Sequence, residues 1–184
     1  MRAARLSASL VLVATVLAAG GPAIADCADF AQPGVYWRRC LQDGQNLRAV
    51  DLTEANLRDA SFKRADLTEA LLVGVDARRA KFVSATMVEI DLSNARLVQA
   101  DLTKADLTGA SLVEADLTRA KLFRANLKRA NLTGARLDGT DLLNADLAGA
   151  TWIDGVTICA EDSIGQCHRR TGEQTVGSDE EPSG

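Results

Sequence analysis

Between Leu47 and Trp152, leucine or a substitute for it recurs at every fifth position without an insertion or a deletion. The stretch contains 22 such central positions, and an alanine lies two residues before the centre in 17 of them. Ala100 to Arg119 is typical and reads ADLTK, ADLTG, ASLVE, ADLTR. An internal repeat this strict constrains the fold more than any other property of the chain, so it must be interpreted first.

Neither a helix nor a strand can bury residues that recur every five positions. Five residues advance an α-helix by about 140°, and along a strand they end on the opposite face. Half of the leucines would then face water. All of them can point inward only if the chain turns a corner after each unit, so that five residues form one side of a closed coil. The repeat therefore predicts an all-β solenoid of short strands and turns.

The number of sides per coil follows from the residue before each centre, which should stack on its equivalent one coil away at about 4.8 Å. Three sides would stack Asp51 on Asp66, and five sides would stack Asp116 on Asp141. Like charges opposite one another on neighbouring strands are unfavourable, which argues against both.

Four sides give a stacking period of 20 residues, and two columns then alternate in charge. These columns are Asn56, Asp76, Arg96, Asp116, Arg136 and Ser61, Lys81, Asp101, Lys121, Asp141. We therefore expect four sides and about five and a half coils. Two pairs break the rule, Arg58 with Arg78 and Glu69 with Glu89, and we expect their long side chains to splay into water at corners.

The units resemble those of the pentapeptide-repeat family, in which alanine, Asp or Asn, leucine and two variable residues recur. The resemblance covers residues 47–152. It implies a right-handed quadrilateral β-helix. Because folds of this kind carry many functions, the resemblance does not by itself imply an activity.

Residues 1–25 have the pattern of a secretory signal peptide. Two arginines precede an apolar run from Leu6 to Ala19, and an Ala-x-Ala cleavage site follows at residues 23–25. A membrane-spanning anchor is the alternative, but it needs about 20 apolar residues and this run is shorter. The sequence therefore predicts a mature chain that starts at Asp26, has no transmembrane anchor and is periplasmic or secreted.

Segments on both sides of the repeat are expected to cap the solenoid, because its end coils would otherwise present open strand edges and an apolar cross-section. Residues 26–46 break the five-residue pattern and are predicted to form an N-terminal cap. Residues 153–167 are predicted to form the C-terminal cap. The polar residues 168–184 are predicted to be a disordered tail.

The four cysteines of the chain all lie in these predicted caps. In an exported chain they are expected to form two disulfides, for which three pairings exist. The coils separate the two caps by roughly 26 Å, whereas a disulfide tolerates a Cα separation of about 7 Å. We therefore expect Cys27 to pair with Cys40 and Cys159 with Cys167. A metal site or a redox pair is the alternative, but neither pair has CxxC spacing and His168 is the only histidine.

The exceptions to leucine at the central positions cluster in space. On the four-sided register Phe62 stacks on Phe82 in the next coil, and the small Ala77 lies beside them. We interpret this as volume compensation, with a ligand cavity at Ala77 as the rival interpretation. The core positions that represent the prediction are Leu67, Phe82, Met87, Leu107, Leu127 and Trp152.

The same register divides the surface charges between two pairs of sides. Counting the residue before each centre and the two after it, the sides centred on Leu107 and Leu112 carry ten acidic and three basic residues, a sum of −7. The sides centred on Leu97 and Leu102 carry twelve basic and six acidic residues, a sum of +6. We call these pairs of sides the acidic flank and the basic flank.

The basic flank supplies the candidate interaction surface, with chance division and local ion pairs as the alternative. Two stacked neighbours, Phe123 and Leu143, offer an apolar anchor for a partner protein or for a second copy in a homodimer. The candidate residues are Arg58, Lys63, Arg64, Arg78, Arg96, Lys104, Phe123, Arg124 and Leu143.

No catalytic, metal or cofactor motif stands out from the repeat, since its Asp and Thr residues recur with the five-residue period. We therefore expect a noncatalytic exported scaffold that binds an unidentified protein. Removing the leader brings the formal net charge to −6, which disfavours nonspecific nucleic-acid binding. The alternative, from the resemblance, is a DNA-mimicking protein that binds DNA gyrase and confers quinolone resistance. A membrane-facing basic flank is a third use, without an amphipathic or lipid-anchor signal.

Overall fold

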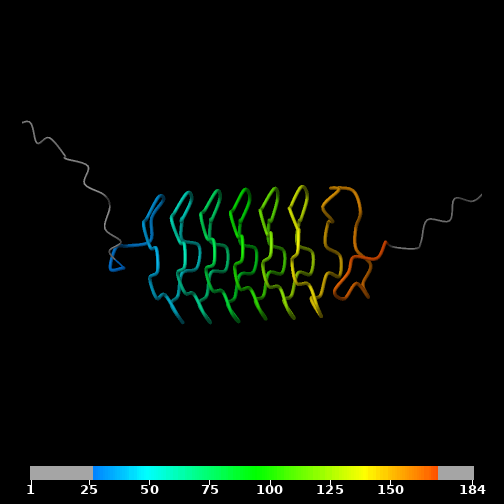
Figure 1. The fold of residues 1–184 in the computed structure, drawn as a ribbon, viewed down its shortest axis with the longest axis horizontal. Coiled ribbons are helices and arrows are strands. Elements are labelled where there is room, and N and C mark those ends of the chain that lie inside the picture. The colour runs from blue at the N-terminus through cyan, green and yellow to red at the C-terminus, as the bar shows by residue number, and fades with distance from the viewer. Residues whose placement is uncertain (1–26, 170–184) are drawn as a thin grey trace, which may run out of the picture.

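The computed structural model describes residues 27–169, which form an elongated stack of coils (Figure 1). Within this range the backbone contains no helix and no extended strand. It alternates instead between single β-bridges and turns, with a period of five residues. The predicted leader, its cleavage site and the tail from residue 170 onward lie outside the described residues.

The β-bridges set the size of the coil. They are parallel and join each bridge residue to the one 20 positions later, from Tyr36–Asn56 through to Asn131–Thr151. A coil therefore has four five-residue sides, and both charge-alternating columns of the sequence analysis are confirmed. Most stacked neighbours of opposite charge in these two columns are not close enough to form an ion pair. The structure records one such pair there, Arg136 with Asp116 at 3.9 Å.

Each coil is hydrogen-bonded to the coils on both sides of it. The N–H of the central Leu107 donates to the carbonyl of Asn126 in the next coil at 2.7 Å. The N–H of the preceding Asp106 donates to the carbonyl of Ala85 in the previous coil at 3.0 Å. A coil thus has donors pointing along the axis in both directions, which satisfies its backbone only when neighbouring coils are present.

The corners that the repeat predicts are tight turns, but the sequence did not reveal their type. At each one the alanine N–H donates back to the central carbonyl, as in Ala110 to Leu107 at 3.0 Å. The second residue after the centre has a positive φ, and 17 of these residues are not glycine, with φ between 52° and 63°. A positive φ at the second of two turn residues is the pattern of a type II turn, where glycine fits best.

The axis of the stack is filled by the central residues and the alanines. The predicted core residues Leu67, Phe82, Met87, Leu107 and Leu127 are fully buried. The predicted aromatic stack is confirmed, because the Phe62 and Phe82 rings lie 5.2 Å apart and 8° from parallel. Ala77 is fully buried in the same cluster. Trp152, at the last central position, is only partly buried against the core.

The coils begin earlier than predicted, so the N-terminal cap is shorter than residues 26–46. Tyr36 and Leu41 already form bridges to the next coil, and Trp37 and Gln42 occupy central positions. The prediction was wrong here because neither residue matches the leucine pattern. Trp37 is 2% exposed, and its ring lies 6.4 Å from that of Phe62, so it packs against the aromatic stack from the neighbouring side of the coil.

Cysteines close both ends with the predicted pairing. Cys40 takes a buried alanine position of the coil and is bonded to Cys27, with a Cα separation of 5.4 Å. Cys159 is bonded to Cys167 at a Cα separation of 5.0 Å.

The C-terminal cap covers the last coil by reversing the direction of the chain. Antiparallel bridges join Thr151 to Ile158 and Asp146 to Ile164. Leu147 donates its N–H to the carbonyl of Ser163 at 2.8 Å, which satisfies part of the open edge. A further bridge between Cys159 and Arg169 extends the cap past Cys167, so the predicted tail begins too early.

Candidate interaction surface

The aspartates and asparagines before the centres serve the turns rather than chemistry. At twelve of these positions the side-chain oxygen accepts the N–H two residues later. The N–H groups on either side of it, at the centre and at the second residue after the centre, donate to carbonyls of the next coil. The N–H between them has no such backbone partner, and the side chain accepts it instead. At Asp66 the Thr68 hydroxyl also donates, at 2.6 Å, and lowers the pKa of the carboxyl. Carboxylates held ionised in this way are poor proton donors.

Three arginines one coil apart line the N-terminal half of the basic flank. We call Arg38, Arg58 and Arg78, each the first residue after a centre, the arginine ladder. The expectation that Arg58 and Arg78 splay into water was wrong, because all three side chains are half-buried. The reason is the turn: this position lies against the coil, and the next residue, the one with positive φ, projects.

Within residues 27–169, the last member of the arginine ladder is the one that is hydrogen-bonded to a carboxylate. The Arg78 guanidinium donates to Asp76 through Nε at 2.8 Å and through Nη2 at 2.6 Å. Burial opposes the ionised form of Asp76, but these bonds and the charge of Arg78 lower its pKa overall. The Nε atoms of Arg38 and Arg58 are buried without a hydrogen-bond partner.

The second side of the basic flank, centred on Leu102, carries most of the candidate residues. Arg64, Lys104 and Arg124 occupy the projecting turn position of one column and are exposed. Phe123 is half-buried, with the Arg124 guanidinium 5.1 Å from the centre of its ring, whereas Leu143 in the next coil is 63% exposed. The predicted apolar pair is therefore one open leucine beside a phenylalanine covered by a cation.

The candidate residues share one flank but not one site. Arg58, Arg78 and Arg96 lie on the side centred on Leu97, and the others lie on the side centred on Leu102. At the corner between the two sides the structure has a groove of about 390 Å³ that the sequence did not single out. We call it the corner groove; its lining residues are Arg79, Lys81, Gln99, Asp101, Arg119 and Lys121.

The corner groove is predominantly basic. Of its four cations, Arg79 is paired with Asp59 of the preceding coil, at 2.7 Å from Nε. Asp101 lies between Lys81 and Lys121 in one column. The sequence does contain a signal for this groove. It is seen when two neighbouring columns are set side by side: the projecting residues of one side, Arg79, Gln99 and Arg119, and the first residues of the next side, Lys81, Asp101 and Lys121.

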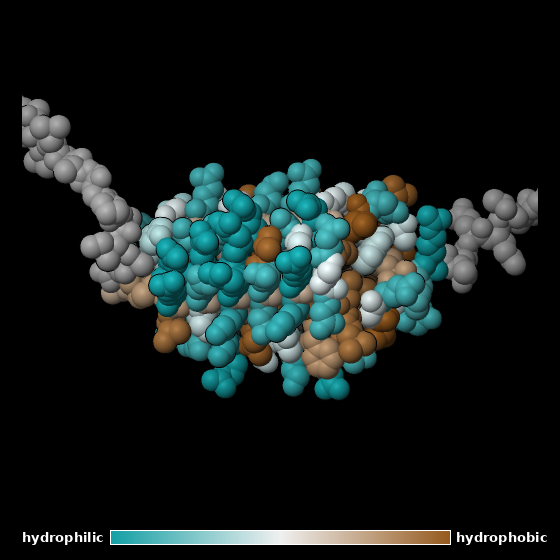
Figure 2. Space-filling model, in the orientation of Figure 1, coloured by the Kyte–Doolittle hydropathy of each residue, from teal (hydrophilic) through white to brown (hydrophobic). Residues whose placement is uncertain are grey.

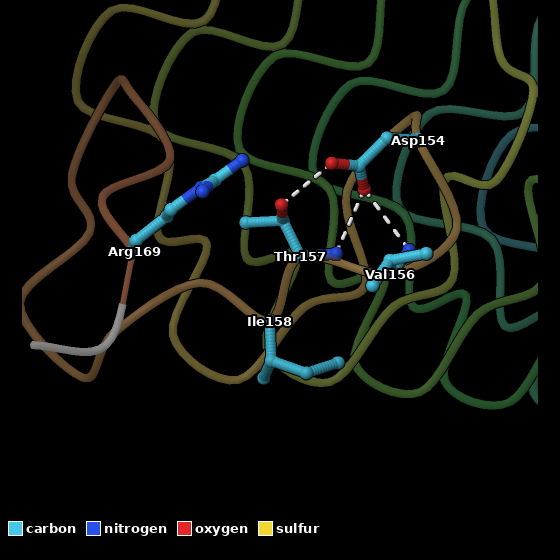
Figure 3. A pocket seen from close by; sticks show the side chains of 5 residues that line it. All are labelled: Asp154, Val156, Thr157, Ile158 and Arg169. Atoms are coloured by element: carbon cyan, nitrogen blue, oxygen red, sulfur yellow. Dashed lines mark hydrogen bonds between the residues drawn. The ribbon is translucent and has the colours of Figure 1, made fainter. Parts of the chain in front are cut away.

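A larger groove, of about 530 Å³, lies in the C-terminal cap (Figure 3). Its carboxylate, Asp154, accepts from the Thr157 hydroxyl at 2.6 Å and from the N–H groups of Thr157 and Val156 at 2.8 and 3.0 Å. These bonds lower the pKa of Asp154 to about 2. The Arg169 side chain extends along the same groove, and Val156 and Ile158 are exposed.

Apolar surface is concentrated near this cap. On the face drawn in Figure 2, the N-terminal half is mostly hydrophilic and hydrophobic residues gather toward the C-terminal end. Most of the exposed large hydrophobic residues belong to this end of the chain: Leu143, Ile153, Val156, Ile158 and Ile164.

Residues 27–169 contain no group of three or more His, Cys, Asp or Glu side chains placed to hold a metal ion. In the same range no helix is long and apolar enough to cross a membrane. His168 contributes its backbone to the cap, where its carbonyl accepts from Ala160 at 2.8 Å.

Comparison with known proteins gives one family. The family described as pentapeptide repeats matches residues 46–82, 85–124 and 125–151, in 8 copies. No curated protein matches the chain.

Several solved structures are similar to the chain. A pentapeptide repeat protein, Rfr23, from the cyanobacterium Cyanothece 51142 is 30% identical, with 57% of this chain and 82% of that one covered and a TM-score of 0.46. HetL, a pentapeptide repeat protein involved in heterocyst differentiation regulation in Nostoc sp. strain PCC 7120, is 26% identical over 66% of this chain and 80% of its own, with a TM-score of 0.34. QnrB1, a plasmid-mediated fluoroquinolone resistance protein, is 21% identical over 64% of this chain and 63% of its own, with a TM-score of 0.41.

The family match spans more than half of the chain and coincides with the coils that the bridges define. Such membership implies a right-handed β-helix. The chain belongs to the pentapeptide-repeat family.

Proposed function

We propose that this protein is a noncatalytic exported scaffold that binds an acidic partner protein through its basic flank. The observation that carries the proposal is the separation of charge on the folded coil, with a sum of +6 on two adjacent sides and −7 on the other two. Such a separation favours one orientation of approach for a charged partner and raises the rate of encounter.

Two further features support the proposal. The aspartates that could suggest acid–base chemistry are committed to turn N–H groups, which leaves the surface suited to binding rather than to proton transfer. The leader pattern of residues 1–25 and the two disulfides fit an oxidising compartment outside the cytosol.

Site-specific crosslinking in the native host tests the binding surface. A photoreactive residue in place of Lys104, which projects from the basic flank, is expected to form an adduct with an acidic protein of the cell envelope. The matched control is Arg129, a basic residue at the same projecting turn position on the acidic flank. Equal adducts from both positions, or from neither, would contradict the proposed use of the basic flank.

Export is tested separately by the intact mass of the protein from its native host, with thiol alkylation under denaturing, nonreducing conditions. We expect a chain that starts at Asp26 and has no alkylated thiol. A chain that retains Met1 with four reactive thiols would place the protein in the cytosol and end the export proposal.

A second candidate is inhibition of DNA gyrase by mimicry of the duplex. The observation that favours it is the acidic flank, whose ten acidic residues lie on two adjacent sides of a rod. A supercoiling assay decides: mimicry predicts inhibition at micromolar protein that is lost when Glu54 and Glu114 of one exposed column are replaced by glutamine. The basic flank does not resemble the acidic DNA duplex that gyrase binds, so we place this candidate second.

A further inference from the structure

The arginine ladder is unlike the projecting arginines of the basic flank because its side chains lie half-buried against the coil. Successive members lie one coil apart, at about 4.8 Å in the backbone, since the bridges run between residues 20 positions apart. Arg38 and Arg58 make no hydrogen bond or ion pair through their guanidinium groups within residues 27–169, and both Nε atoms are buried. A buried Nε–H without an acceptor is unfavourable, because this donor has lost water and gained no other partner.

The acids nearby are already in use. Asp76 binds Arg78 with both carboxylate oxygens. Asp59 binds Arg79 in the same way, at 2.7 and 2.9 Å. Asp59 and Asp76 also attract Arg38 and Arg58 through their charge, but their carboxylate oxygens are bonded to Arg79 and Arg78. The ladder therefore has a hydrogen-bonded end at Arg78 and two members before it whose guanidinium groups bond to no carboxylate within residues 27–169. These carboxylates offset only part of the mutual repulsion of the stacked cations, and an anion bound between Arg38 and Arg58 would offset more of it.

The buried Nε atoms determine which donors a ligand can reach. Only the Nε atoms of Arg38 and Arg58 are buried without a partner, so their Nη groups are the donors left for a ligand, on residues whose backbones lie one coil apart. A planar guanidinium matches the oxygens of a phosphate group, and two of them can share one such group.

We propose that Arg38 and Arg58 form a site for a phosphate group, with Arg78 held by Asp76 as the fixed end of the ladder. The proposal rests on the proposed use of the basic flank for binding, and it names the ligand chemistry of the N-terminal part of that flank. The phosphate comes either from a soluble, multiply phosphorylated molecule or from a phospholipid headgroup.

The test uses the mature chain with both disulfides intact and sodium tripolyphosphate as the probe, titrated calorimetrically at low salt. Arg58→Gln is expected to weaken binding by about tenfold or more, since charge-assisted hydrogen bonds to one fork are lost. Arg129→Gln removes the same charge from the opposite flank and is expected to change affinity less than about twofold.

A readout of stability separates a binding role from a structural one. Without phosphate, Arg58→Gln is expected to raise the melting temperature, because it removes a repelling charge and a buried donor without a partner. Arg58→Lys keeps the charge without the fork and is expected to recover less than half of the lost affinity. If Arg58→Gln lowers the melting temperature and leaves tripolyphosphate binding unchanged, the site is structural and the proposal is wrong.

Cosedimentation with vesicles of phosphatidylglycerol and phosphatidylcholine distinguishes the two sources of phosphate. Binding to tripolyphosphate that depends on Arg58 indicates a soluble ligand, and binding to vesicles alone that depends on Arg58 indicates a headgroup. Binding to neither overturns the proposal. The crosslink at Lys104 is read independently, so the failure of the phosphate site and the failure of the proposed partner surface are distinguishable.

Discussion

At the scale of single residues, the five positions of a unit have separate physical tasks. Leucine and alanine fill the axis, and the polar residue before the centre accepts an N–H that makes no backbone hydrogen bond to the adjacent coils. The last residue takes a positive φ, which costs a side-chain-bearing residue roughly 1 kcal/mol or more compared with glycine. Arginine, glutamate and lysine hold many of these strained corners. Their side chains project furthest, so the positions with strained backbone are also the ones that present charge at the surface.

Asp91 tests the task of the polar position in isolation. Its Oδ1 accepts the Ser93 N–H at 2.9 Å, and its stacked neighbours, Leu71 and Ser111, are uncharged. We expect Asp91→Ala to lower the free energy of unfolding by about 1 kcal/mol, as loss of a capping acceptor does. Asp91→Asn keeps the acceptor and should lie within about 0.5 kcal/mol of the wild type. Urea denaturation measures both, and equal losses would show that charge rather than the N–H acceptor matters.

At the scale of the coil and the caps, stability depends on how well each element covers the next. A central leucine is surrounded by alanines and by the leucines of adjacent coils, so its removal leaves a cavity that the closed coil cannot collapse. The C-terminal cap works differently: it places antiparallel backbone against two sides of the last coil. Leu137 and Leu142, on the other two sides, are partly exposed.

Leu107→Ala in the middle of the stack is expected to cost about 2 to 5 kcal/mol, because Leu107 is fully buried. Leu143→Ala is the control, since the 63% exposed Leu143 should contribute less than about 1 kcal/mol. Urea denaturation of the disulfide-bonded protein gives both values from the shift in midpoint at constant slope. Similar costs at the two positions would mean that Leu107 is not in a packed core.

The sequence predicted the coil, its four sides and the cysteine pairs because each depends on a strict period and on sheet spacing. It missed the first coil because Trp37 and Gln42 fill leucine positions by shape rather than by residue type. It misplaced the arginine ladder because column positions do not tell which turn residue lies against the coil and which projects. That distinction is set by the positive φ of the last residue, which the sequence left undetected because glycine is absent from most corners.

At the scale of the whole molecule, the charge pattern has a longer period than the coil. In the two columns from Asn56 to Arg136 and from Ser61 to Asp141, charge alternates from one coil to the next, so these columns repeat every two coils. The length of the stack and its surface are therefore coupled. Coils can be removed without disturbing the hydrophobic axis, but only removal in pairs keeps opposite charges stacked.

Two deletions that preserve the five-residue frame test this coupling. Deleting residues 85–104 removes one coil and should stack Asp76 on Asp116, Lys81 on Lys121 and Asp66 on Asp106. Deleting residues 85–124 removes two coils and should restore Asp76 to Arg136 and Lys81 to Asp141. Both variants lose core, so both should be less stable than the full stack.

Salt separates the two effects. Repulsion between exposed like charges is screened as ionic strength rises, whereas the loss of buried area is not. The urea midpoint of the one-coil deletion should therefore rise with sodium chloride, by more than that of the two-coil deletion at each concentration. Although it is shorter, the two-coil deletion should approach or exceed the one-coil deletion in stability at low salt if each stacked like pair costs up to about 1 kcal/mol. Equal salt responses would mean that the alternation along the stack is not a stabilising feature and that only the hydrophobic axis sets its length.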